Sequence, residues 1–223
     1  MKRIYVLCEG QTEESFVNDL MYLPLLSKEI IIYPIVCFTK REKSGLKYKG
    51  GVSTYKKIKK ELLNLCQSHK NEYVTMFFDY YALPSDTPGM DTLPNDSALE
   101  KIRHLEDNIG KDINSNNFIP NLVMHEFEGL LFSKPEAFSY CIESERSINK
   151  LKEIRDSHTS PEDIDNSPST APSKRILEIY PEYKKVLHGV NIAKDIGMPT
   201  ITSQCKHFSD WISRISTLSE KEA

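Results

Sequence analysis

The stretch Val6-Leu7-Cys8-Glu9-Gly10-Gln11-Thr12-Glu13 decides which fold we expect for this chain. A short apolar run ends at a carboxylate and a glycine, and Thr12 is then placed to cap a helix. This pattern is typical of a strand that leads directly into a helix. Ligands of open α/β sheets bind just outside the carboxyl ends of the strands. We therefore expect Glu9 to lie at a functional edge, with Glu13 one helical turn further on.

Two later apolar runs also end at acidic residues. Residues 73–78 lead into Asp79, and residues 118–124 lead into His125, Glu126 and Glu128. Carboxylates that gather at one edge of a sheet repel one another unless a counter-ion lies between them. The sequence therefore predicts a divalent cation held by acids from three strand ends.

The acids around residue 126 suggest how such a cation would be bound. Glu126 and Glu128 alternate along the chain, so an extended backbone would place both on one side and turn Phe127 toward the core. Oxygen ligands, together with only 6 histidines in the chain, favour Mg²⁺ or Mn²⁺ over zinc. We expect His125 and Thr12 to support the ligands rather than bind the ion. Glu13 has a simpler alternative role, which is to complement the positive end of its helix.

Lys174 is a candidate cation for the same site. It lies in the segment Ser167-Pro-Ser-Thr-Ala-Pro-Ser-Lys174-Arg175, where Thr170 or Ser173 can cap a following helix. Lys174 then falls in the first turn, where the helix dipole disfavours a positive charge. A nearby anion would explain that position, either a substrate phosphate or the charge that develops when a phosphodiester is attacked. The alternative is that Lys174 and Arg175 are ordinary surface residues.

The order of the expected elements predicts an α/β fold. Strands and helices alternate through the first half, which implies a four-stranded parallel sheet flanked by helices. Pro34 suggests that the second strand lies at an edge of the sheet. We expect residues 1–132 to form the α/β core and residues 133–223 to form a helical part packed on it. The expected strands are 3–8, 30–38, 73–78 and 118–124, and the expected helices are 12–26, 54–68, 97–109, one near 135, 147–156, 173–180, 184–196 and 202–218.

The bulk composition fits a globular protein that stays in the cytoplasm. The chain has 223 residues, 39% of them hydrophobic, which is enough for one sizeable core. No apolar run approaches the roughly 20 residues of a membrane helix, and the run before Glu9 is too short for a signal peptide. The 5 cysteines are scattered without a C-x-x-C pair. We therefore expect reduced and mostly buried thiols.

A basic segment interrupts a chain whose formal net charge is −3. Residues 40–60 hold nine Lys and Arg against the single acid Glu42. Such a segment can attract the phosphates of a nucleic acid even when the whole protein is acidic. A solvated loop and helix face is the alternative interpretation. The candidate nucleic-acid contacts are Lys40, Arg41, Lys43, Lys47, Lys49, Lys56, Lys57 and Lys60.

Several motifs together resemble a known family. The segments CEGQTE, FFDYYALP, HEFEGLL and SPSTAPSKRI are similar to the bacterial domain-of-unknown-function 4276 family, over nearly the whole chain. The pattern also resembles the Toprim superfamily, with Glu9 after the first strand, although Asp79-Tyr80-Tyr81 lacks the second acid of the D-x-D motif. The closer likeness is to OLD-type Toprim nucleases, whose site acids and late lysine are matched in order by Glu9, Glu13, Asp79, Glu126, Glu128 and Lys174.

The resemblance implies a Toprim-like nuclease that acts with a partner ATPase in bacterial anti-phage defence. Two Mg²⁺ or Mn²⁺ ions about 4 Å apart would orient a water molecule and stabilise the leaving oxygen. Glu9, Asp79, Glu126 and Glu128 would be ligands, Glu13 would assist the second ion or position water, and Lys174 would meet the phosphate. A non-catalytic subunit that docks on the ATPase and a small-molecule phosphohydrolase remain as alternatives. A homo-oligomer is also possible.

Overall fold

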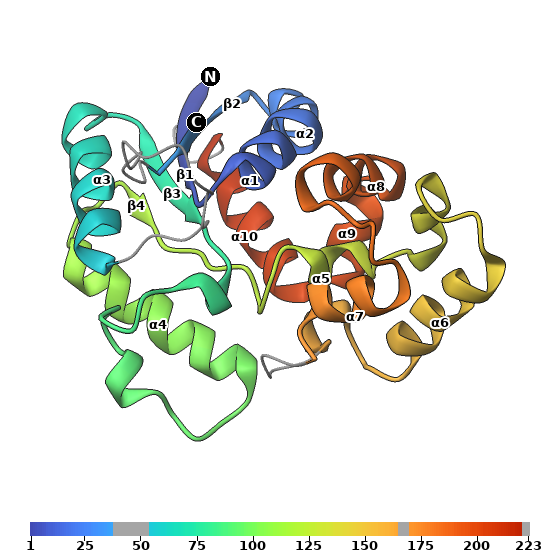
Figure 1. Ribbon diagram of the computed structural model, residues 1–223. Helices are drawn as coiled ribbons and strands as arrows, with labels where there is room; N and C mark the ends of the chain where they lie inside the picture. The colour runs from blue at the N-terminus through green and yellow to red at the C-terminus, as the bar shows by residue number, and fades with distance from the viewer. Residues whose placement is uncertain (38–53, 165–169, 220–223) are drawn as a thin grey trace, which may run out of the picture.

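The computed structural model describes residues 1–37, 54–164 and 170–219. Four strands in that part of the chain form one parallel sheet, in the order β2-β1-β3-β4 (Figure 1). The expected four-stranded parallel sheet is confirmed, and β2, which contains Pro34, lies at an edge of it as predicted. The strands are β1 (Lys2–Cys8), β2 (Ile30–Val36), β3 (Tyr73–Phe77) and β4 (Phe118–Ile119).

Helices cover both faces of the sheet because successive side chains of each strand point to opposite faces. Leu7 and Met76 belong to a core that includes α3 (Tyr55–Ser68) and α4 (Ala98–Ile113). Val6 and Phe77 belong to the other core, which includes α1 and α10 (Lys206–Ser216). A continuous helical segment follows β1 and consists of α1 (Gln11–Phe16), a π-helical turn (Val17–Met21) and α2 (Tyr22–Leu26).

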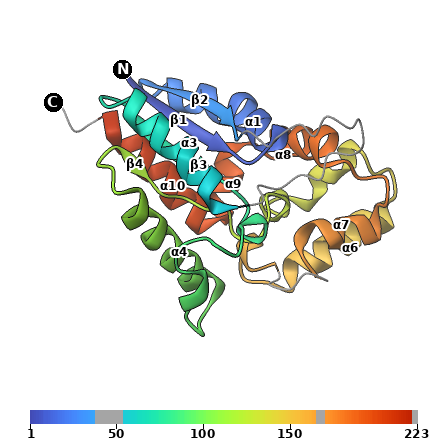
Figure 2. The ribbon, with the colours of Figure 1, turned by 60° about the vertical axis from the view of Figure 1, so that its left-hand side comes forward.

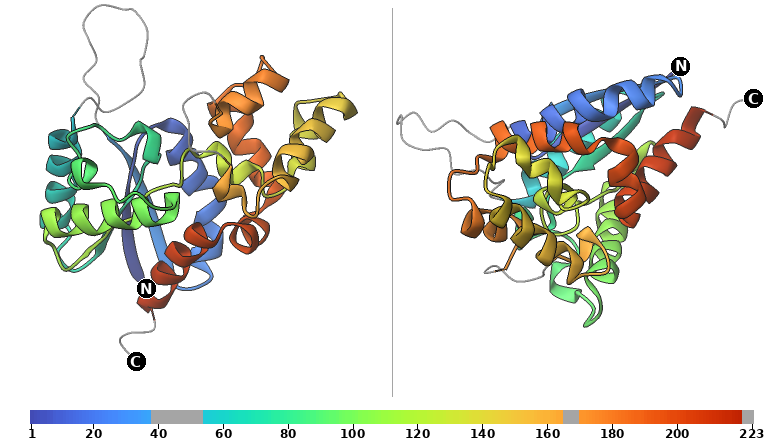
Figure 3. Two further views of the ribbon diagram at one scale, coloured as in Figure 1. Left: turned by 90° about the horizontal axis from the view of Figure 1, so that it is seen from below. Right: turned by 90° about the vertical axis from the view of Figure 1, so that its right-hand side faces the viewer.

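The second half of the chain is helical. Figures 2 and 3 show α6 and α7 on the side of the sheet away from α3 and α4. Trp211 of α10 stacks on Phe77 with ring centroids 5.3 Å apart, and its Nε1–H donates to Thr75 Oγ1 at 3.0 Å. The sheet and the last helix therefore share one core, and the expected boundary at residue 132 stays a prediction. The elements are α5 (Glu128–Leu131), a 3₁₀ turn (Pro135–Tyr140), α6 (Glu145–Asp156), α7 (Pro172–Ile179), a π-helical turn (Lys185–Gly189), α8 (Val190–Ile196), α9 (Met198–Gln204) and α10.

The fourth strand is much shorter than predicted. It was expected to reach residue 124, yet β4 ends at Ile119. Pro120 follows at once and has no N–H to donate, so the ladder is interrupted there. The side chain of Asn121 donates to Met76 O at 3.1 Å instead, and a single bridge resumes between Val123 and Asp79. Backbone hydrogen bonds then continue to His125, whose carbonyl oxygen accepts the Tyr81 N–H at 3.1 Å, so the chain follows the end of β3 until it turns at His125.

Other expected features match more closely. Ser97 caps α4 as predicted, because its side chain accepts the Glu100 N–H at 3.2 Å. Helix α4 runs on to Ile113 rather than 109, and it ends where Asn114 takes a left-handed conformation with φ 47°. All five cysteines are free thiols, as expected. No helix among the described residues has the length and apolar character needed to cross a membrane.

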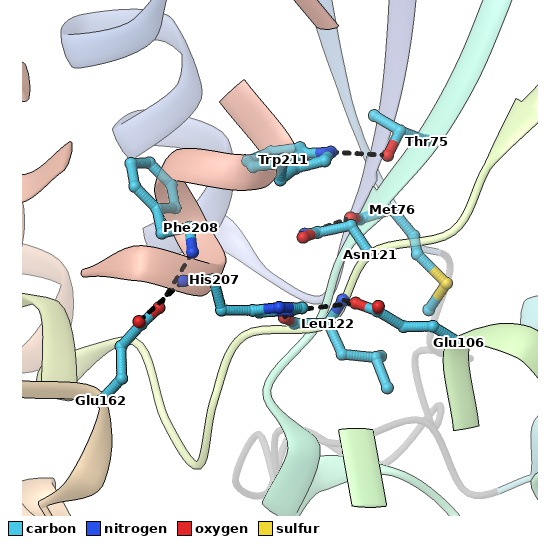
Figure 4. A network of polar contacts seen from close by, with 9 residues as sticks. All are labelled: Thr75, Met76, Glu106, Asn121, Leu122, Glu162, His207, Phe208 and Trp211. Carbon is cyan, nitrogen blue, oxygen red and sulfur yellow. Dashed lines mark hydrogen bonds and ion pairs between the residues drawn. The ribbon is translucent and has the colours of Figure 1, made fainter. Parts of the chain in front are cut away.

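Buried acids fix the start of α10, in an arrangement that we call the α10 clasp and define by Glu106, Glu162 and His207 (Figure 4). The two Glu162 oxygens accept the backbone N–H groups of His207 and Phe208, each at 2.9 Å. The His207 ring nitrogen Nε2 lies 3.0 Å from Glu106 Oε1 and 3.1 Å from Leu122 O. Burial alone would lower the pKa of His207, but the hydrogen bond to Glu106 and the two nearby carboxylates outweigh it and raise that pKa.

Candidate functional site

The parallel pairing of β1 and β3 brings the first two acids together. Cys8 is in register with Phe77, and the Glu9 N–H donates to Phe77 O at 3.3 Å. Glu9 therefore follows the end of β1 at the level where β3 also ends, two residues before Asp79. The Asp79 backbone donates a hydrogen bond to the Glu9 carboxylate. The sheet itself places these two predicted site residues side by side, as the strand-end pattern indicated.

Asp79 links the sheet to the segment before α5. It is 5% exposed, and its Oδ1 accepts the Phe127 N–H at 2.8 Å. Its Oδ2 accepts a hydrogen bond from Lys185 Nζ, also at 2.8 Å. Both oxygens of Asp79 are thus engaged, one by a backbone group and one by a side-chain cation.

Two further carboxylates enter the same place from the starts of helices. Glu13 is the third residue of α1 and is 3% exposed, and Glu128 is the first residue of α5 and is 2% exposed. Lys185 Nζ lies 3.1 Å from Glu13 Oε1 and 3.5 Å from Glu128 Oε2. We call Glu9, Glu13, Asp79 and Glu128 the carboxylate cluster. It unites predicted site residues from three separate parts of the sequence.

The backbone at residues 125–128 differs from the expectation. Glu126 and Glu128 were expected on an extended strand, but His125 has φ 59° and the chain turns into α5. Glu126 is half-buried at the margin of the cluster, and its Oε2 accepts the Ser173 N–H at the start of α7 at 3.0 Å. Glu126 also contributes to raising the pKa of Glu128, so the two carboxylates interact.

Lys185 is the cation of the cluster, and the sequence analysis did not identify it. It opens the π-helical turn Lys185–Gly189, a rare geometry that is often found at functional sites. A side chain at Gly189 would place its Cβ 2.8 Å from Tyr183 Oη and 3.1 Å from a Phe127 ring carbon. Glycine therefore permits the close approach that sets the turn against the start of α5. The ammonium lies 5.6 Å from the centroid of the Phe127 ring.

The shifted pKa values of the cluster residues indicate an excess of negative charge. Burial, Asp79 and Glu13 raise the pKa of Glu9 to about 8. Burial also raises the pKa of Glu128 to about 7, although Lys185 opposes that shift. Burial disfavours the charged form of Lys185, but the surrounding carboxylates outweigh burial and raise its pKa well above the usual value.

Four buried polar atoms at the cluster have no hydrogen-bond partner among the described residues, and they are Glu9 Oε2, Glu13 Oε1, Glu128 Oε2 and Tyr183 Oη. The Glu13 and Glu128 oxygens still form ion pairs with Lys185 Nζ, at 3.1 and 3.5 Å. The Glu128 carboxylate acts on Tyr183 electrostatically and, after burial, is the next cause of its raised pKa. Buried polar atoms that lack a partner cost free energy, so the cluster is not arranged for stability alone.

Three other predicted site residues lie near these elements without joining the cluster. Lys174 is exposed in the first turn of α7 and forms no ion pair with any residue that the structure describes. Thr12 is buried within α1 and does not cap it, because Gly10 is the residue at the cap position. His125 is 1% exposed, and its ring lies 5.3 Å from that of Tyr81. The expected cap at Thr12 is therefore wrong, whereas the supporting roles of Thr12 and His125 and the phosphate contact of Lys174 stay predictions.

The residues fit a divalent cation in chemistry but not in their present arrangement. Carboxylate oxygens are the ligands that Mg²⁺ and Mn²⁺ prefer. However, no three Asp, Glu, His or Cys side chains in the described ranges are grouped so as to hold an ion. Lys185 Nζ stands among Glu13, Asp79 and Glu128 at the point where an ion would be expected.

The basic segment is only partly described. Lys40, Arg41, Lys43, Lys47 and Lys49 lie outside the described residues. On α3, Lys56 and Lys60 are exposed, and Lys57 is half-buried. Lys59, by contrast, forms an ion pair with Asp112 at 2.7 Å. The described part of the segment thus leaves two fully exposed lysines among the predicted nucleic-acid contacts.

Lys185 shares with Lys174 the feature that made Lys174 a candidate, a positive charge at the start of an expected helix. Lys185 lies at the start of the helix expected over 184–196, where the dipole disfavours a positive charge just as it does at residue 174. No periodic pattern distinguishes the two lysines. The anion that the argument required is present near Lys185, because three cluster carboxylates lie within 3.5 Å of its Nζ.

Comparisons with known proteins extend along nearly the whole chain. The C-terminal region of the Burkholderia pseudomallei OLD protein is 14% identical, with a TM-score of 0.47, and the match covers 98% of this chain and 99% of that one. The C-terminal region of the Xanthomonas campestris pv. campestris OLD protein is 15% identical, with a TM-score of 0.40, and the match covers 96% and 97%. The expected likeness to OLD proteins is thus found, but at this distance it says nothing of activity.

Other comparisons give the family. No curated protein matches the chain significantly. The model of one family, described as "Domain of unknown function (DUF4276)", matches residues 8–216. The match includes every residue of the carboxylate cluster as well as Lys185. The chain therefore belongs to the DUF4276 family.

Proposed function

We propose that this protein is a Mg²⁺- or Mn²⁺-dependent phosphodiesterase, and specifically a nuclease, with the carboxylate cluster as its active site. The observation that carries the proposal is the imbalance of charge at the carboxyl edge of the sheet. Four carboxylates converge there, and among the described residues Lys185 forms ion pairs with three of them, Glu13, Asp79 and Glu128. Folding gains little from such an arrangement, because like charges oppose one another in a poorly solvated place. Perturbed acids at a strand edge are typical of functional sites.

Each acid has a role in this proposal. Glu9, Asp79, Glu126 and Glu128 would hold the ions, and Glu13 would assist the second ion or position the attacking water. When bound, the ions would supply positive charge to the phosphodiester and promote ionisation of water. Asp79 is oriented by the Phe127 N–H, and Glu126 is oriented by the Ser173 N–H. These backbone donors hold the carboxylates in place without adding mobile charge.

The basic segment supports a nucleic acid as the substrate. Lys56 and Lys60 are exposed on α3, which follows directly after the basic residues 40–49. Contacts of this kind neutralise the phosphates of a nucleic-acid backbone and do not depend on the base sequence. Replacing Lys56, Lys57 and Lys60 by Gln should weaken nucleic-acid binding and flatten its salt dependence. A small-molecule phosphohydrolase would be indifferent to those changes.

A non-catalytic docking subunit of a partner ATPase is the second candidate function. One observation favours it, because Lys185 forms ion pairs with three of the carboxylates and so partly balances their charge. In that case the cluster would fix the helices α1 and α5 and the Lys185 turn to the sheet. Resemblance to a family often encoded beside an ATPase suggests the partner.

The two candidates are separated by an activity assay. The purified chain is incubated with Mn²⁺ and with DNA, RNA or bis-p-nitrophenyl phosphate, and cleavage is followed. Asp79→Asn and Glu9→Gln should each lower turnover by about a hundredfold or more, the scale expected when an electrostatic group is lost from an active site. Asp91→Asn, which changes an exposed acid, is the matched control. Residual activity equal to that of the control in both variants would remove the cluster from the reaction and favour the docking subunit.

A further inference from the structure

We propose that Lys185 is a built-in competitor of the divalent cation, so that its ammonium must leave the carboxylate cluster before an ion can bind. The inference rests on the proposed metal site and adds to it a means of holding the site inactive. Lysine and the ion would be alternative occupants of the same place.

The geometry supports competition rather than coexistence. Lys185 Nζ lies 2.8 Å from an oxygen of Asp79, 3.1 Å from one of Glu13 and 3.5 Å from one of Glu128. The ammonium therefore contacts three of the four carboxylates in the cluster. An ion bound by these same oxygens would lie within a few ångströms of a like charge, where repulsion is severe in a poorly solvated place.

The lysine is also built to withdraw. Its stem is long and unbranched, so the ammonium can swing away without any movement of the sheet. The turn that carries it is anchored at Gly189, which is buried against Tyr183 and Phe127. The next two residues after Lys185 are largely in solvent, because Val186 is 53% and Leu187 is 54% exposed. Little burial is therefore lost if the beginning of the turn moves.

Charge balance favours the exchange once metal is plentiful. A single ammonium leaves the cluster with surplus negative charge, and within the described ranges the buried Glu9 Oε2 has no hydrogen-bond partner. A divalent ion carries twice the charge of the ammonium, and Glu9 Oε2 can bind to the ion as a ligand. The lysine therefore stabilises the metal-free state, whereas the ion is the better counter-ion at sufficient concentration.

The first test measures Mn²⁺ binding by calorimetry on the full chain, without any substrate. Lys185→Met keeps the stem but removes the competing charge, so its binding midpoint should fall to a Mn²⁺ concentration at least tenfold lower than that of wild type. Lys184→Met changes the adjacent exposed lysine and should behave as wild type. Equal midpoints in all three proteins would overturn the competition while leaving the metal site intact. Weaker binding by Lys185→Met would also overturn it, since Lys185 would then help to build the site.

The second test needs no variant and applies if Lys185→Met fails to fold. Wild-type protein is treated with an amine-acylating reagent, and modification at Lys185 is quantified by mass spectrometry. The ammonium should be protected in chelator and become modified several-fold faster in saturating Mn²⁺, while Lys184 reacts equally in both. Protection that persists with Mn²⁺ bound would refute displacement. If neither calorimetry nor melting detects Mn²⁺ binding to wild type or Lys185→Met, the proposed function fails together with the inference.

Discussion

The carboxylate cluster and the α10 clasp are both groups of buried acids beside the same sheet. They differ in how many hydrogen-bond donors and cations their carboxylates contact. In the clasp, each oxygen of Glu162 accepts one backbone N–H, and Glu106 meets both His207 and the Leu122 N–H. In the cluster, Lys185 is shared by three carboxylates, and Glu9 retains a buried oxygen without a partner among the described residues.

The difference separates acids that hold the fold from acids whose negative charge is in excess, as we propose for a metal site. A buried carboxylate with all its acceptors filled fixes the groups around it, as Glu162 fixes the first turn of α10. A group of carboxylates that outnumbers its donors stores repulsion, which a cation can relieve. Burial alone does not distinguish the two places, since Glu162 is 5% and Glu128 is 2% exposed. The two places are distinguished by the balance between the carboxylates and the hydrogen-bond donors and cations around them.

The largest expected effect comes from removing the cation of the cluster. In chelator, Lys185→Met should reduce the free energy of unfolding by about 3 kcal/mol, the lower end of the scale for deleting one partner of a buried ion pair, because the Lys185 side chain is 33% exposed. Urea unfolding measures the change. Lys206→Met, which removes the partner of Asp210 on the surface of α10, should cost no more than about 0.5 kcal/mol. A loss as small as that of the control would mean that the cluster does not depend on Lys185.

A smaller effect is expected from the clasp, because both of its carboxylates accept hydrogen bonds from described residues. Glu162→Gln keeps one acceptor for the N–H groups of α10 but turns an amide NH₂ toward the other donor. We expect a loss of about 2 kcal/mol, read as a lower melting temperature. Glu178→Gln, an exposed change on α7, should leave the melting temperature unchanged. An unchanged Glu162→Gln variant would show that the clasp does not fix α10.

The smallest expected effect depends on pH and has the opposite sign. The pKa of Glu9 is raised from 4.5 to about 8 in the folded protein, so its protonated form favours folding. That contribution is fully present below the unfolded pKa of 4.5 and is lost as the pH rises through about 8. The glutamine of the Glu9→Gln variant does not ionise. In chelator at about pH 9 the variant should therefore be more stable than wild type by ~1 kcal/mol, a modest difference because the Glu9 side chain is partly solvated.

The same pair of proteins should have nearly equal stability at about pH 4, where Glu9 is protonated in both the folded and the unfolded wild type. Chemical unfolding across this pH range measures the difference. Glu182→Gln, at an exposed acid, should follow wild type throughout. A stability difference between Glu9→Gln and wild type that does not grow with pH would mean that Glu9 is adequately paired, and the contrast between the two groups of acids would be lost.

Local sequence predicted the strands and the acids at their ends. The run before Glu9 and the run before Asp79 are apolar because their strands are covered on both faces, so β1 and β3 were found within a residue or two. Parallel pairing then brings Glu9 and Asp79 to one edge without further information. The sequence was less informative after residue 119, where Pro120 ends the ladder and the chain turns at His125. A positive φ at a histidine has no pattern in the sequence that announces it.

The sequence by itself thus determined the parallel sheet, its edge strand at Pro34 and the acids that its carboxyl ends present, because strand periodicity and parallel order are local properties of the chain. Only the tertiary structure decided which cation meets those acids. Lys174 and Lys185 look alike in the sequence, since both open helical segments that follow turns. Lys185 reaches the cluster because Gly189 lets its turn approach Phe127 and Tyr183, a contact between distant segments that no local pattern encodes.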